Sequence, residues 1–130
     1  MDEIEIEKLK TILSNIPEIK LAYLFGSRAS ATAGPLSDYD FAFYLDCRDQ
    51  DKMEEIRYLL IDPISQILKT DKVDIVILNL VGSPEMKYDI IRSGKLFFEK
   101  EPFKVIVEPN ILYEYFDFRS FLERNHLTRS

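Results

Sequence analysis

Three short apolar runs recur along this chain, and segments with helical periodicity separate them. The runs are residues 19–25, 38–46 and 72–79. Short runs rich in aromatic and β-branched residues predict buried strands. Because helical segments alternate with these strands, the sequence predicts an α/β (α+β) domain in which helices flank a sheet.

The segments between the runs carry apolar residues at the spacing of one helix face. Residues 2–15 and residues 50–69 both show this pattern and are predicted to form amphipathic helices. Pro63 lies within the second segment. Proline removes a backbone donor and crowds the preceding turn, so we expect a kink or a split in this helix.

The last part of the chain contains a clear helix start. Ser83-Pro84-Glu85 combines a hydroxyl N-cap, a proline in the first turn and an acidic residue after it, and Gly94 marks the end of the predicted helix. Residues 95–99 are predicted to form a short strand. Residues 103–126 are predicted to be mostly helical, with a disturbance at Pro109.

Length and composition limit the class of protein. A chain of 130 residues is typical of one domain, which we divide into a core of residues 1–100 and a helical extension of residues 101–130 that packs on the core or on a partner. The net charge of −6 argues against direct binding to nucleic acid, and the single cysteine, Cys47, excludes an internal disulfide. No run approaches the ~18 apolar residues of a membrane span, and the acidic start lacks a signal peptide, so we expect a cytoplasmic protein that binds no membrane.

Asp38 and Asp40 stand where the second apolar run begins. Alternate residues of a strand face the same side, so the two carboxylates are predicted to lie side by side. Asp74 is the single charged residue within residues 73–78. If its strand lies beside the second one, three carboxylates converge, and such oxygen ligands suit two Mg²⁺ ions of the kind that assist displacement at phosphorus.

Gly26-Ser27 follows the first run and supplies a turn to which a phosphate could bind. Glycine lets the backbone approach closely, the Ser27 hydroxyl donates hydrogen bonds, and Arg28 adds a positive charge. The alternative is ordinary loop chemistry, in which the two acids of Asp38-Tyr39-Asp40 only cap backbone amides. The combination of these motifs with Asp74 favours the functional interpretation.

The order Gly26-Ser27, ten residues, Asp38-Tyr39-Asp40 resembles the signature of minimal nucleotidyltransferases, a branch of the DNA polymerase beta superfamily. Asp74 matches the third carboxylate of that superfamily, and the resemblance covers nearly the whole chain. One departure is Ala31, where many relatives have glycine. The resemblance implies the polymerase beta-like fold, which is a mixed sheet flanked by helices.

The resemblance also implies an activity and a partner. Minimal nucleotidyltransferases are commonly antitoxins that transfer AMP from ATP to a tyrosine of a helical HEPN ribonuclease toxin. Carried over, Asp38, Asp40 and Asp74 would bind two Mg²⁺ and Asp74 would help to deprotonate the acceptor hydroxyl. Gly26 and Ser27 would hold the triphosphate, and pyrophosphate would leave.

Two alternatives stay open: a binding antitoxin that acts by occlusion, and a transferase for a small hydroxylated molecule. The short chain leaves little room for a small-molecule pocket and therefore favours a protein acceptor. Packing against the sheet is expected to bury some of the aromatic and leucine residues of the tail, and the rest would form a patch for a partner or for a homodimer. These residues are Leu112, Tyr113, Tyr115, Phe116, Phe118, Phe121 and Leu122.

Overall fold

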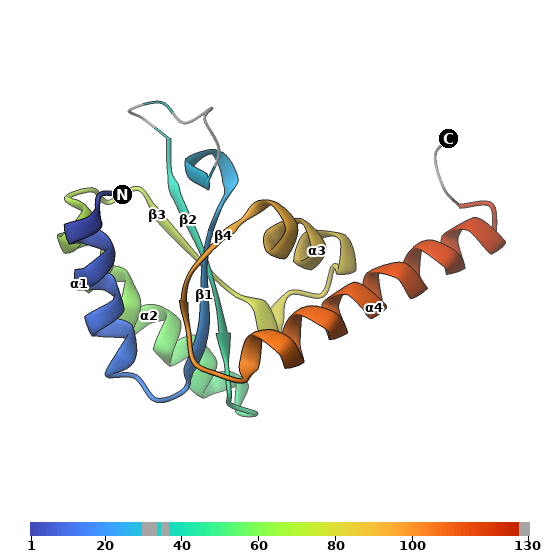
Figure 1. The fold of residues 1–130 in the computed structure, drawn as a ribbon, viewed down its shortest axis with the longest axis horizontal. Helices are drawn as coiled ribbons and strands as arrows, with labels where there is room; N and C mark the ends of the chain where they lie inside the picture. The colour runs from blue at the N-terminus through green and yellow to red at the C-terminus, as the bar shows by residue number, and fades with distance from the viewer. Residues whose placement is uncertain (30–33, 35–36, 128–130) are drawn as a thin grey trace.

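The computed structural model describes residues 1–29, 34 and 37–127. Helices and strands alternate along most of the chain, as the sequence predicts (Figure 1). The elements are α1 (Glu3–Ser14), β1 (Ile19–Phe25), β2 (Tyr39–Leu45), α2 (Gln50–Leu68), β3 (Val73–Ile77), α3 (Pro84–Ser93), β4 (Lys95–Glu99) and α4 (Phe103–Arg124), with short 3₁₀ helices at Gly26–Ala29 and Leu78–Leu80.

The four strands form one mixed sheet in the order β3-β2-β1-β4. β1 is antiparallel to both of its neighbours, β2 and β4, whereas β2 and β3 run parallel. The parallel pair is possible because α2 connects the end of β2 to the start of β3, which is the crossover that such a pair requires. The α/β expectation with a mixed sheet is therefore confirmed.

Helices cover both faces of the sheet (Figure 1). α1 and α2 pack on one face over a core that includes Phe41, Phe43 and Ile75. α3 and α4 lie on the other face, over a smaller core that includes Tyr23 and Ala42. Because successive side chains of a strand alternate between faces, β2 contributes Phe41 and Phe43 to the first core and Ala42 to the second.

The sequence predicts a kink or a split of α2 at Pro63, and the structure shows no split. The helix continues as a single element from Gln50 to Leu68 with Pro63 inside it. Its apolar face is buried on both sides of the proline, with Leu60 fully buried before it and Ile64 nearly so after it. Burial of this continuous face offsets the hydrogen bond that the proline cannot make. Pro109 likewise lies within an unbroken α4.

β3 is shorter than predicted because Asn79 replaces its last strand pairing with side-chain hydrogen bonds. The backbone leaves the strand after Ile77 and forms a 3₁₀ helix. The Asn79 amide then donates to the Leu45 carbonyl at 2.8 Å, and its oxygen accepts from the Leu45 N–H at 3.0 Å. This pair of bonds satisfies both backbone groups at the end of β2.

The start of α3 agrees with the sequence. The Ser83 hydroxyl accepts a hydrogen bond from the Met86 N–H at 3.2 Å, Pro84 begins the helix and Gly94 follows its last residue. The strand predicted at residues 95–99 is β4. Within the part of the chain that the structure describes, no helix has both the length and the apolar character needed to cross a bilayer.

α4 projects beyond the sheet, and its far end stands apart from the rest of the molecule (Figure 1). Only Val107 and Ile111 of this helix are buried. The expectation that the sheet buries part of the aromatic tail is therefore wrong, because the helix leaves the sheet before it reaches those residues. Among them, Tyr113 is 72% exposed and Phe116 is 56% exposed.

Three contacts hold α4 against the rest of the molecule. The Tyr23 hydroxyl of β1 donates to Glu108 at 2.5 Å, and Lys87 of α3 forms an ion pair with Glu114 at 2.8 Å. The Tyr115 ring stacks on Tyr88 of α3 with a centroid separation of 3.9 Å. Burial raises the pKa of Tyr23 far above its ordinary value and the bond to Glu108 adds to this, so the hydroxyl stays protonated as the donor.

We expect Tyr23→Phe to lower the free energy of unfolding by about 1–3 kcal/mol, because it leaves the half-buried Glu108 without its donor. Chemical denaturation measures the change. Tyr113→Phe is the matched control, since its side chain is exposed on the same helix that Glu108 occupies. Equal stability of the two variants would contradict a role for this bond in anchoring α4.

Candidate active site

The register between β2 and β3 brings two of the predicted carboxylates together. Asp40 is paired directly with Asp74 across the parallel strands. Register partners project to the same face of a sheet, and here that face is the one covered by α3 and α4, because Ala42, two residues beyond Asp40, belongs to their core. Asp38 stands just before β2, two residues from Asp40.

The three carboxylates repel one another at the position of Asp40. Partial burial raises the pKa of Asp40, and the negative charges of Asp74 and then of Asp38 raise it further. Asp74 is the one charged residue of β3, as the sequence indicates, but its side chain is exposed, so its charge does not carry the cost of burial in an apolar strand. Asp74 lies on an edge strand. The residues before and after it, Val73 and Ile75, pack on the opposite face of the sheet, under α1 and α2.

The donor set fits a magnesium ion by its chemistry, because all three groups are carboxylates from adjacent strand positions. In the described residues, however, no three histidine, cysteine, aspartate or glutamate side chains stand close enough to form a metal-binding group. The structure therefore puts Asp40 and Asp74 on one face of the sheet and Asp38 close enough to affect the charge of Asp40, and the metal-binding role of the three residues stays a prediction.

Gly26 is the residue that lets the turn after β1 approach Asp40. Its backbone has a φ of +72°, which lies in the left-handed region that glycine adopts without strain. A Cβ at this position would collide with Oδ2 of Asp40 and would lie 3.2 Å from its Cγ. Glycine is therefore required twice, by the backbone conformation and by the carboxylate beside it. Ser27 follows within the same 3₁₀ helix.

Arg28 contacts the other end of the loop. Its guanidinium Nη2 donates to the Ser37 carbonyl at 3.0 Å and its Nε to the same oxygen at 3.2 Å. The guanidinium carbon also lies 4.2 Å from the centre of the Tyr39 ring. These contacts tie the turn after β1 to the start of β2 and so support the positions of the acids. The phosphate contact expected of Arg28 stays a prediction, and Ala31 lies outside the described residues.

A cleft of about 690 Å³ opens beside the turn that contains Gly26. α3 forms its opposite wall with residues at helical spacing, which the sequence analysis did not single out as functional. The signal was available, since the predicted helix start fixes which residues of α3 share a face. The lining residues are Phe25, Gly26, Met86, Asp89, Ile90 and Ser93.

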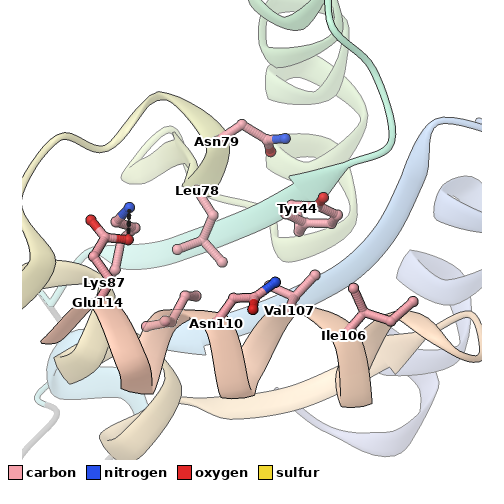
Figure 2. A pocket seen from close by; sticks show the side chains of 9 residues that line it. Tyr44, Leu78, Asn79, Lys87, Ile106, Val107, Asn110 and Glu114 are labelled. Carbon is pink, nitrogen blue, oxygen red and sulfur yellow. Dashed lines mark hydrogen bonds and ion pairs between the residues drawn. The ribbon is translucent and has the colours of Figure 1, made fainter. Parts of the chain in front are cut away.

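A second, smaller cavity of about 160 Å³ lies between β2 and α4 (Figure 2). Tyr44 and Asn79 line one side, and the ion pair between Lys87 and Glu114 closes one end. Tyr44 is four positions beyond Asp40 on β2, which corresponds to ~13 Å along a strand. This cavity is therefore separate from the carboxylates.

Comparison with known families identifies the fold and the family. The sequence model of the family described as "Polymerase beta, Nucleotidyltransferase" matches residues 7–103. This match covers most of the chain, so the chain belongs to the polymerase beta nucleotidyltransferase family. The matched region contains both the Gly26-Ser27 turn and the three carboxylates.

Individual relatives agree with this assignment. The protein adenylyltransferase MntA of Aphanizomenon flos-aquae is 34% identical over 95 residues, which are 68% of this chain and 63% of that protein. The match thus spans less than two thirds of the relative. A toxin–antitoxin complex solved with AMP-PNP superimposes with a TM-score of 0.73 at 24% identity, covering 95% of this chain and 94% of that one.

A tri-AMPylated Shewanella oneidensis HEPN toxin in complex with an MNT antitoxin gives a TM-score of 0.70 at 21% identity. That match covers 95% of this chain and 94% of the solved chain. At these identities the two solved structures establish the fold.

We expect Gly26→Ala to destabilise the protein by about 1–2 kcal/mol from the backbone conformation alone, with a further cost from the collision with Asp40. Gly82→Ala is the control, because a Cβ there meets no atom within 4 Å. Urea denaturation of both variants measures the difference. A Gly26 variant as stable as the Gly82 variant would show that the turn does not need glycine.

We expect Asp40→Asn to raise the melting temperature at pH 7 in the absence of divalent cations. Because the pKa of Asp40 is raised in the folded protein, the folded state binds this proton more tightly than the unfolded chain does. Ionisation of Asp40 therefore costs stability as the pH rises through the interval between the ordinary and the raised pKa.

The gain should accordingly disappear below about pH 4, where both states are protonated. Calorimetric melting between pH 3 and pH 8 tests the dependence. Asp117→Asn, a change at an exposed acid on α4, should show no such trend. A loss of stability at pH 7 in the Asp40 variant would contradict the repulsion described here.

Proposed function

We propose that this member of the polymerase beta nucleotidyltransferase family is an antitoxin that transfers AMP from ATP to a hydroxyl, most simply a tyrosine, of a HEPN ribonuclease toxin. The observation that carries the proposal is the pairing of Asp40 with Asp74 beside the glycine turn at Gly26. The similarity to a protein adenylyltransferase supports the reaction, and the likeness to toxin–antitoxin complexes supports the partner.

The positions of the residues suggest a division of labour. Gly26 and Ser27 would bind the triphosphate through the turn's backbone and the Ser27 hydroxyl, and Arg28 follows them in the same 3₁₀ helix. Asp38 and Asp40 would hold two Mg²⁺ with Asp74, and bound magnesium would neutralise charge on the phosphates. Asp74, on the edge strand, would accept the proton of an incoming hydroxyl.

The reaction is a displacement at the α-phosphorus. The acceptor oxygen forms a bond to that phosphorus, the bond to the bridging oxygen breaks, and pyrophosphate leaves with the electron pair. The acceptor proton passes to Asp74 or through it to solvent. This chain positions the two reactants, and its carboxylates would hold the Mg²⁺ that neutralises the charge on the phosphates. ATP and Mg²⁺ abound in the cytoplasm, where we place the protein.

Occlusion is the second candidate function, and the exposed aromatic side chains of α4 favour it. Tyr113, Phe116 and Phe121 are each at least half exposed on this helix. Such a surface suits contact with a protein, including the HEPN toxin or a second copy of this chain. Contact and catalysis are compatible, since a bound toxin must present its hydroxyl to the carboxylates.

We expect incubation with ATP labelled at the α-phosphate, Mg²⁺ and the toxin to label the toxin. The double variant Asp38→Asn, Asp40→Asn should reduce labelling by about a hundredfold or more, because the carboxylates that would hold Mg²⁺ beside the phosphates are lost. Asp62→Asn, a change at an exposed acid on α2, should label normally. Lack of transfer by the unchanged protein, although it binds the toxin, would overturn the proposal. Full neutralisation by the double variant would instead support occlusion.

A further inference from the structure

The cleft beside Gly26 has no role in the reaction as described so far. It lies between the end of β1 and α3, with Phe25 and Gly26 on one side and Met86, Asp89 and Ser93 on the other. α3 lies beside the turn that follows β1 (Figure 1). At about 690 Å³, it is within the usual range of small-molecule sites, roughly 300–1,000 Å³.

Gly26 connects this cleft to the carboxylates. The same residue lies against the Asp40 carboxylate and lines the cleft. A ligand whose phosphates bind at the turn could therefore extend directly into the cleft. The phosphate-binding turn and the cleft are thus two parts of one continuous surface.

The strand order separates the cleft from the acceptor. Asp74 lies on β3 at one edge of the sheet, whereas β1, which leads to the cleft, lies beyond β2. An acceptor that gives its proton to Asp74 approaches over β3. The cleft is therefore on the side of the nucleotide, and a bound nucleoside there would leave the approach over β3 open.

The walls of the cleft match a nucleobase. Ile90 forms an apolar floor that is 1% exposed, and Met86 and Phe25 add apolar surface on either side. Asp89 and Ser93 are the polar groups, and both are exposed on α3. A base needs apolar contact for its flat faces and hydrogen-bonding groups at its edge. A carboxylate only accepts hydrogen bonds, so it favours the donating amino group of adenine over the carbonyl oxygen that stands in the same place in hypoxanthine.

We propose that this cleft binds the nucleoside of the nucleotide substrate, with Asp89 accepting a hydrogen bond from the amino group of adenine. This inference rests on the proposed nucleotidyl transfer and adds to it a residue that determines base specificity. Met86 and Ile90 contact the face of the base. Asp89 is a specificity residue and takes no part in the chemical step.

Binding calorimetry in the presence of Mg²⁺ tests the proposal without the toxin. The probes are ATP, inosine triphosphate, which lacks the amino group, and tripolyphosphate, which lacks the nucleoside. We expect the unchanged protein to bind ATP about tenfold more tightly than inosine triphosphate, the effect of one hydrogen bond to a charged group. Tripolyphosphate reports the phosphate-binding turn alone.

The Asp89→Ala variant should bind ATP about tenfold more weakly, so that ATP and inosine triphosphate become equal. Its affinity for tripolyphosphate should not change. Asp89→Asn, whose amide oxygen still accepts, should restore part of the preference for ATP. Asp117→Ala, an acid on α4, should behave as the unchanged protein. With toxin present, Asp89→Ala should raise KM for ATP and leave kcat within about twofold.

Equal weakening of all three probes by Asp89→Ala would overturn the proposal, because it would indicate general damage to the site. An unchanged preference for ATP would overturn it as well. A second variant, Ser93→Trp, fills the cleft. It should weaken the binding of ATP and leave the binding of tripolyphosphate unchanged. Failure of the unchanged protein to bind ATP at all would contradict the proposed nucleotidyl transfer. This outcome differs from ATP binding without a role for Asp89, so the two proposals can fail separately.

Discussion

The parallel pairing of β2 and β3 is the interaction on which the rest of the site depends. It places Asp40 opposite Asp74, and a shift of one residue would turn one of them to the other face. The register is held by burial, since Phe41 and Ile75 pair one position further along and both lie in the core under α1 and α2. The hydrophobic core therefore determines the geometry of the carboxylates.

The same alternation gives β2 two tasks with opposite demands. Phe41 and Phe43 are fully buried and contribute apolar packing, whereas Asp40 on the same strand puts a carboxylate beside two others, which raises its pKa. The absence of a side chain at Gly26 leaves room for this carboxylate. Such local costs are common where a protein positions reactive groups, and packing elsewhere offsets them.

Much of the fold could be predicted because the spacing of apolar residues and the residues at helix starts and turns indicate the same element boundaries. The run at residues 19–25 coincides with β1, and the Ser83 cap marks the start of α3. Pro63 was misleading, since long-range burial of one helix face outweighs a local break. The early end of β3 depends on Asn79 meeting Leu45, a contact between residues far apart in the sequence. The α3 wall of the cleft has a local signal, the helical spacing of Met86, Asp89, Ile90 and Ser93, but its place beside Gly26 depends on how α3 packs against the turn after β1.

The edge position of Asp74 has a consequence for association. β3 and β4 are the outer strands of the sheet, and each is only five residues long. An open edge invites another chain to add a strand, which is a route to aggregation, and short length and charge both oppose it. Asp74 on β3 and Lys95 with Glu99 on β4 supply that charge. The carboxylate predicted to take part in catalysis thus also disfavours the addition of a strand from another chain at this edge of the sheet.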